Sequence, residues 1–91
     1  MEELKVDMFL VTSRLMSEVL VAETDEDALL NSRIKNRLVL SVERLNHRAV
    51  LHFNQLESGE TRIYVEDYLK QHPEPHSVGI ILEGESPLSI E

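Results

Sequence analysis

Apolar side chains recur at intervals of three and four residues through the first two thirds of the chain. One stripe runs from Leu4 to Ala22 and a second from Leu30 to Leu56. This spacing places side chains on one face of a helix with 3.6 residues per turn, so it predicts two long helices. The stripes consist of Leu4, Met8, Val11, Leu15, Val19 and Ala22, and of Leu30, Ile34, Leu38, Val42, Leu45, Ala49, Phe53 and Leu56.

Turn-forming residues are scarce in the same region. The first glycine is Gly59 and the first proline is Pro73, whereas a chain that reverses repeatedly usually carries more of both. Residues 24–27 are typical of a helix start, because Thr24 or Asp25 can cap a helix and acidic residues suit its positive end. Gly59 is suited to end the second helix.

The remainder of the chain predicts shorter elements. The pattern over residues 61–71 predicts a third helix, which must end at the prolines within residues 72–76. The pattern over residues 78–82 predicts a short strand or extended arm. We therefore expect a mainly α fold of two long antiparallel helices and a shorter third helix with a C-terminal arm. Residues 1–83 form the single domain in this interpretation, and residues 84–91 form a loosely ordered tail.

A competing pattern indicates strands in the middle of the chain. Arg37–Val42 and Arg48–Phe53 are rich in apolar and β-branched residues, and with Thr61–Val65 they fit a small antiparallel meander. This gives an α+β fold as the alternative. The helical interpretation leads, because residues 43–47 lack a strong hairpin signal such as Asn-Gly.

Composition limits the class of protein. The chain has 91 residues, of which 42% are apolar and 29% charged, and these values suit one globular domain. Cysteine is absent, which excludes disulfides and thiolate metal sites. The N-terminal segment is acidic, unlike a secretory signal, and the apolar runs are too short to span a membrane. We therefore expect a cytoplasmic protein.

Charge is unevenly distributed along the chain, whose net charge is −8. Residues 28–56 carry five cationic residues against one acidic residue, and both flanking segments are strongly acidic. On the predicted second helix, four arginines fall within a sector of roughly 60°. Guanidinium groups bind phosphate or carboxylate in a planar, bidentate manner. This predicted ridge either binds an anionic ligand or partner, or pairs with the chain's own acids; it consists of Arg33, Arg37, Arg44 and Arg48.

The predicted first helix has more apolar surface than a three-helix monomer needs. Phe9, Met16 and Leu20 form a second stripe, about 120° from the first on a helical wheel. A second apolar face must be covered, and another copy of the chain is one way to cover it. The pattern therefore predicts that these three residues form an assembly face.

Motifs for catalysis are missing from the sequence. There is no glycine-rich phosphate loop, no nucleophile elbow and no spacing that sets a nucleophile beside a base. His72 and His76 flank Glu74, but a fourth metal ligand is not evident, and a solvated loop explains them better.

These observations favour a non-enzymatic protein-binding or assembly module, such as an adaptor, regulator or inhibitor, that self-associates. We expect no cofactor, no metal and no membrane contact. The chain has few aromatic side chains on which bases could stack, and this disfavours a nucleic acid as partner. Two alternatives stay open. One is a small regulator that binds an anionic or nucleotide ligand through the four arginines, and the other is an acidic nucleic-acid mimic that blocks a basic partner.

Overall fold

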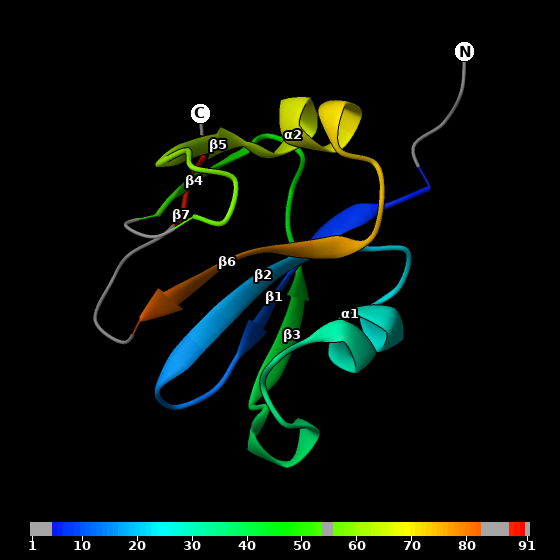
Figure 1. Cartoon of the computed structure of the whole chain (residues 1–91), viewed down its shortest axis with the longest axis vertical. Helices are drawn as coiled ribbons and strands as arrows, with labels where there is room; N and C mark the ends of the chain where they lie inside the picture. Colours follow the sequence, from blue (N-terminus) through cyan, green and yellow to red (C-terminus); the bar gives the residue numbers. More distant parts are fainter. Residues whose placement is uncertain (1–4, 54–55, 83–87, 91) are drawn as a thin grey trace.

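Strands are more extensive than helices in the structure (Figure 1). The computed structural model describes residues 5–53, 56–82 and 88–90. In chain order the elements are β1 (Asp7–Thr12), β2 (Met16–Ala22), α1 (Asp25–Asn31), the 3-10 turn η1 (Asn36–Leu38), β3 (Ser41–Arg44), β4 (Ala49–His52), β5 (Arg62–Tyr64), α2 (Val65–Gln71), β6 (His76–Leu82) and β7 (Leu88–Ile90).

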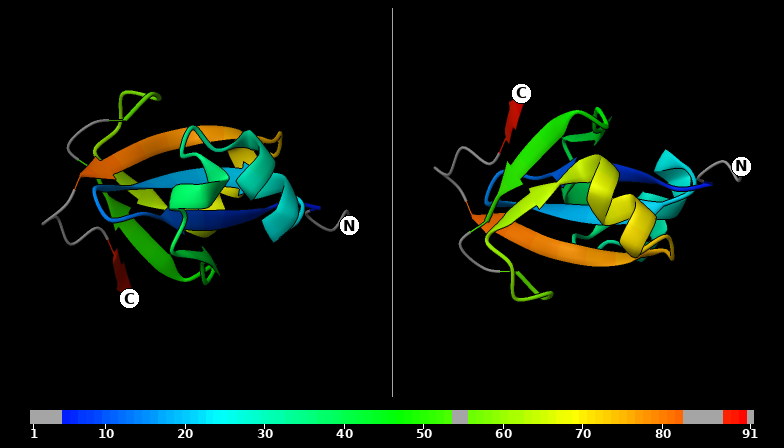
Figure 2. Two further views of the ribbon diagram at one scale, coloured as in Figure 1. Left: turned by 90° about the horizontal axis from the view of Figure 1, so that it is seen from below. Right: turned by 90° about the horizontal axis from the view of Figure 1, so that it is seen from above.

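The strands form two antiparallel sheets. The larger has the order β3-β1-β2-β6, and the smaller has the order β5-β4-β7. Figure 2 shows the two helices on opposite sides of the molecule, α1 in the view from below and α2 in the view from above. The larger sheet therefore lies between two layers, with α1 on one face and α2 with the smaller sheet on the other.

Both faces of the larger sheet are buried, and this explains the apolar pattern of its central strands. In β1, Met8 and Leu10 belong to the core shared with α2 and the smaller sheet, whereas Phe9 and Val11 belong to the core under α1. A strand buried on both faces is a continuous apolar run rather than an alternating one. Such a run contains every spacing, including the three- and four-residue steps of a helix.

The predicted mainly α fold is therefore wrong. Residues 7–22 form the β1–β2 hairpin, and residues 36–52 supply η1, β3 and β4. Of the strands in the alternative interpretation, β4 and β5 lie where it expects them, but β3 pairs with β1 and not with β4, so the three strands form no meander. The helix start at Thr24 is real, since its Oγ1 accepts a hydrogen bond from Asp27 N at 3.1 Å, but this helix ends at Asn31. The third helix exists over Val65–Gln71, and β6 contains the strand expected at residues 78–82.

Side chains take over the role of glycine and proline at the turns. Ser13 Oγ donates to Met16 O at 2.8 Å in the β1–β2 turn, and Asn46 Oδ1 accepts from Arg48 N at 2.8 Å before β4. Serine and asparagine form such local hydrogen bonds readily. The scarcity of glycine and proline was therefore a poor indicator of long helices in this chain.

The predicted C-terminal tail coincides only in part with described residues. Residues 83–87 and 91 lie outside them, and Leu88–Ile90 form β7, which pairs with β4. Among the described residues, no helix combines the length and the apolar character needed to cross a membrane.

Core and surface leucines should respond differently to truncation. Leu51 is fully buried and Leu30 is 76% exposed, so Leu51→Ala should lower the free energy of unfolding by about 2–5 kcal/mol. Leu30→Ala should change it by less than about 0.5 kcal/mol. Urea unfolding followed by circular dichroism measures both values, and equal losses would contradict the placement of these residues.

Candidate functional site

A groove opens at the end of the larger sheet where β1 turns into β2. It has a volume of about 680 Å³, within the usual range for ligand sites. Two segments line it, the β1–β2 turn and the connection from α1 through η1 to β3. We call it the cationic groove; its lining residues are Ser13, Arg14, Leu15, Met16, Arg33, Ile34, Lys35, Arg37, Leu38 and Leu40.

The apolar part of the groove is unusually exposed. Leu15, Leu38 and Leu40 expose 69%, 53% and 66% of their surface. Below them, Met16 is half-buried and Ile34 is buried against the core under α1. Clustered apolar side chains in water favour a site that another molecule covers.

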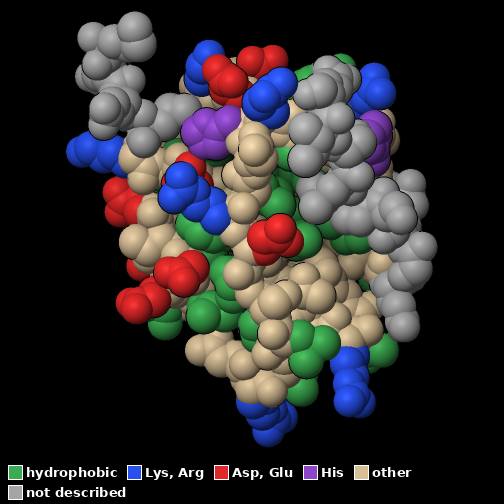
Figure 3. Space-filling model, turned by 180° about the vertical axis from the view of Figure 1, so that it is seen from behind, with side chains coloured by type: hydrophobic (Ala, Val, Ile, Leu, Met, Phe, Trp, Pro, Cys, Tyr) green, Lys and Arg blue, Asp and Glu red, His purple; other side chains and the backbone are tan. Residues whose placement is uncertain are grey.

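The charge of the groove has a single sign. Arg14, Arg33, Lys35 and Arg37 line it, and no acidic side chain among the described residues does. In the described part of the chain, Arg14, Lys35 and Arg37 form no ion pair. In Figure 3, cationic and hydrophobic side chains meet at the lower end of the molecule, where Figure 1 places the β1–β2 turn and η1. A cationic side chain that forms no ion pair within the protein can bind the anionic group of a ligand.

Backbone hydrogen bonds fix the leucines of the groove in place. Leu38 N donates to Lys35 O at 2.8 Å, which closes the turn of η1, and Leu40 N donates to Thr12 O at 2.7 Å. The segment that carries Leu38 and Leu40 is thus tied to β1. The groove is formed before any ligand arrives, which lowers the entropy cost of binding.

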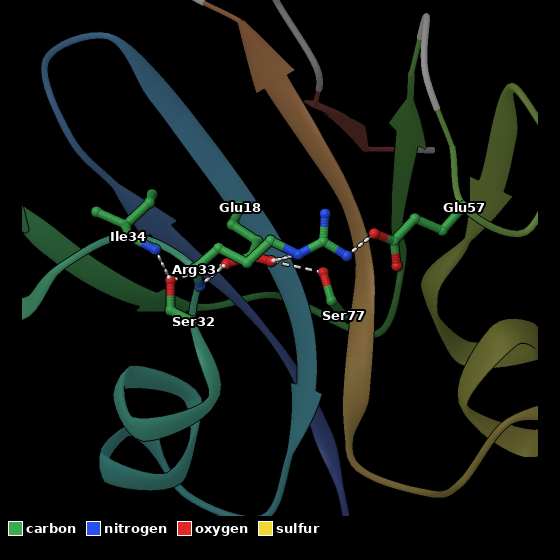
Figure 4. Close-up of polar contacts among 6 residues, drawn as sticks. All are labelled: Glu18, Ser32, Arg33, Ile34, Glu57 and Ser77. Atoms are coloured by element: carbon green, nitrogen blue, oxygen red, sulfur yellow. Dashed lines mark hydrogen bonds and ion pairs between the residues drawn. The ribbon is translucent and has the colours of Figure 1, made fainter.

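A buried carboxylate anchors the other end of this segment (Figure 4). Glu18 on β2 is fully buried. Its Oε1 accepts hydrogen bonds from Ser32 Oγ at 2.8 Å and Arg33 N at 2.7 Å, and its Oε2 accepts one from Ser77 Oγ at 2.6 Å. A buried charge is tolerated only with such partners. Glu18 therefore fixes the chain after α1 to both β2 and β6.

Arg33 differs from the other cations of the groove. Its Nε lies 3.6 Å from Glu18 Oε2, and its guanidinium also forms an ion pair with Glu57 (Figure 4). Two carboxylates thus offset its charge. Among the described residues, Arg14, Lys35 and Arg37 are then the lining cations whose charge no carboxylate offsets.

The four predicted arginines do not form one ridge, because the helix that would align them is absent. The structure brings only Arg33 and Arg37 to the groove. Arg44 lies at the far end of β3, with its Nε 3.5 Å from Asp7 Oδ2, and Arg48 is exposed in the turn before β4. Arg14 and Lys35 were missed, because only the hairpin places residue 14 beside residues 33–40.

The predicted assembly face is mostly core. Phe9 and Leu20 are neighbours across β1 and β2, and they expose only 3% and 0% of their surface. Ala28 of α1 and Ile34 belong to the same cluster. Of the three predicted residues, Met16 alone lines the groove.

The histidines near α2 serve local structure. The hydrogen-bond network assigns the tautomer of His76: a carbonyl only accepts, so Nδ1 donates to Glu74 O at 2.5 Å. Nε2 then accepts from the Tyr68 hydroxyl at 2.6 Å. Both ring nitrogens are occupied. Within residues 5–53, 56–82 and 88–90, no group of three potential metal-ligating side chains is placed to hold an ion.

Comparison with known proteins finds no match to a family model, a curated protein or a solved structure. By its own fold and site, the chain is mostly β, with two antiparallel sheets, two short helices and a preformed groove that is cationic and apolar. Any function has to be argued from that groove.

Removing the charge of the buried anchor should destabilise the fold. Glu18→Gln replaces one acceptor oxygen by an NH₂ group that faces existing donors, so the free energy of unfolding should fall by about 2–4 kcal/mol. Glu57→Gln is the control, because Glu57 meets Arg33 at the surface and such pairs contribute less than about 1 kcal/mol. Urea unfolding measures both, and similar losses would show that Glu18 is not the anchor.

Tyr68 should make stability depend on alkaline pH. Its burial, together with the negative charge of Glu60, raises the pKa of Tyr68 above its ordinary value of 10.0. The folded state thus favours the neutral phenol, so this contribution is complete below pH 10.0 and is lost as the pH rises through the folded pKa. A Tyr64→Phe chain leaves Tyr68 as the one tyrosine, whose absorbance titration should have a raised midpoint. A midpoint that is the same after unfolding would contradict the shift.

Proposed function

We propose that this chain is a non-enzymatic protein-binding module whose cationic groove receives an apolar and acidic segment of a partner protein. One observation carries the proposal: three exposed leucines lie beside three cations that have no ion-pair partner in the described residues. Covering the leucines with an apolar segment is favourable because it removes apolar surface from water, and the cations favour a segment that carries negative charge.

The two kinds of contact reinforce each other. When an apolar segment covers Leu15, Leu38 and Leu40, it also removes water from the neighbouring cations. Ion pairs strengthen as the effective dielectric constant falls. An unpaired cation at the edge of such an interface costs free energy, so a neutral or basic segment is disfavoured.

The groove's own side chains support binding rather than catalysis. Apart from its cations, the lining offers one hydroxyl, that of Ser13, which donates to Met16 O inside its turn. A nucleophile needs a base within hydrogen-bond reach. Within the part of the chain that the structure describes, the lining places no carboxylate, histidine or cysteine beside this hydroxyl.

A small anionic amphiphile is the second candidate ligand. The volume of about 680 Å³ and the mainly apolar lining suit one alkyl chain with a carboxylate or phosphate group. This second candidate corresponds to the anion-binding regulator considered above, with Arg14, Lys35 and Arg37 as the residues that bind the anionic group in place of the four predicted arginines.

Charge reversal in the groove should abolish partner capture. Tagged Lys35→Glu/Arg37→Glu protein, incubated with lysate of the source organism, should bind the partner at least about tenfold more weakly. Leu38→Ser/Leu40→Ser should do the same through the apolar part. The matched control is Lys5→Glu/Arg48→Glu, which makes the same charge change at exposed positions outside the groove.

Quantitative mass spectrometry compares the four captures. A partner held by the wild type and the control but lost from both groove variants supports the proposal, and equal capture by all four overturns it. A co-purified acidic amphiphile that the groove variants lose, without a protein partner, would assign the groove to the second candidate.

A further inference from the structure

The chain carries on its own surface a segment of the kind that the groove is proposed to bind. Leu30 on α1 exposes 76% of its surface, more than the other exposed large apolar side chains among the described residues. Acidic residues occupy the preceding turn of α1 and the residue before its cap. We call this surface the acidic knob; it consists of Glu23, Asp25, Glu26, Asp27 and Leu30.

Helix geometry explains why Leu30 projects outward. Ala28 is fully buried against the larger sheet, and two residues further on the helix has turned by about 200°. Glu26 and Asp27 lie four and three residues before Leu30, so they flank it on the helix surface. The Thr24 cap and the buried Ala28 hold α1 in place, and the knob is therefore preformed.

The knob and the groove are complementary in both charge and apolar character. An exposed leucine flanked by acids matches exposed leucines flanked by cations. Two grooves cannot face each other across a symmetric dimer, because their like charges would meet. The net repulsion between copies at −8 is screened beyond about 8 Å at physiological salt, whereas a contacting pair is affected less.

A molecule cannot fill its own groove with its own knob. Leu30 is not among the lining residues, and α1 is fixed to the sheet beside the groove rather than over it. The matching surface is therefore available only from another copy.

We propose that the acidic knob of one copy binds in the cationic groove of a second copy. Leu30 contacts Leu15, Leu38 and Leu40, and the acids of α1 face Lys35 and Arg37. The inference rests on the proposed function, since it uses the same groove and the same chemistry. It also makes the second copy a competitor of the partner protein, so self-association masks the groove at high concentration.

The contact joins two different surfaces, so each bound copy still presents one free groove or one free knob. Such heterologous contacts extend into chains or close into rings rather than stopping at a symmetric dimer. This property separates the proposal from every two-fold interface, and it allows a test by mixing variants.

Two variants each remove one surface. Lys35→Glu/Arg37→Glu disables the groove, and Glu26→Gln/Leu30→Ser disables the knob without giving it a positive charge that would pair with the reversed groove. In sedimentation velocity from micromolar to millimolar concentration, the wild type and Lys5→Glu/Arg48→Glu should form species larger than a dimer, and each surface variant alone should be monomeric. An equimolar mixture of the two surface variants should form a 1:1 heterodimer and nothing larger, because one intact groove and one intact knob remain.

The outcomes are decisive. A monomeric wild type, a surface variant that still associates, or a mixture that stays monomeric or grows beyond a heterodimer overturns the inference. Circular dichroism of each variant checks that it is folded. The knob variant must still capture the partner protein, because its groove is intact; if it does while the wild type is monomeric, only the self-association is wrong. If the groove variant also captures the partner normally, the proposed function fails as well.

Discussion

One buried carboxylate positions the chain that follows α1. Glu18 lies on a strand face that is otherwise apolar, beside Val11 on β1 and under the chain that follows α1. Taking a carboxylate out of water costs several kcal/mol unless donors replace the water. Ser32, Arg33 and Ser77 supply those donors from two separate parts of the chain. The Glu18 carboxylate needs these donors in order to be buried, and the same hydrogen bonds hold the loop after α1 against the sheet.

The groove follows from this anchoring. Once Ser32 and Arg33 are fixed over β2, Ile34 is placed in the core under α1, and the chain must then return to β3 across the end of the sheet. Lys35 and the residues of η1 make that crossing over the β1–β2 turn. The crossing segment is too short to bury its own leucines, which is why Leu38 and Leu40 stay in water. The same crossing brings the cations of residues 33–37 to Arg14.

Charge is distributed unevenly among the cations that line the groove. Arg33 is used internally, because Glu18 and Glu57 offset its charge. Arg14, Lys35 and Arg37 form no ion pair in the described residues, within a chain whose net charge is −8. A strongly acidic protein with one cationic site repels most other acidic surfaces at low salt and accepts one only where it fits the groove. On the proposals made above, that segment comes from a partner or from a second copy.

Some local features could be read directly from the sequence. A helix start at residues 24–25 and a strand or arm at residues 78–82 were predicted, because capping residues, acidic first turns and β-branched runs act over a few neighbouring positions. The helix predicted over residues 61–71 exists only from Val65, because residues 62–64 form β5. The excess of cations in residues 28–56 was also evident, and part of that excess lines the groove.

The pairing of strands was decided only by the tertiary structure. The runs Met8–Val11 and Val19–Ala22 satisfy a helical period and a doubly buried strand equally well, and only the α1 and α2 layers on both faces of the sheet distinguish them. The groove depends on contacts between residues 13–16 and 33–40, and Glu18 finds its donors 14, 15 and 59 positions away. Sequence alone determined which residues carry charge and apolar surface; the fold decided which of them meet, because distant contacts have no signature in local spacing.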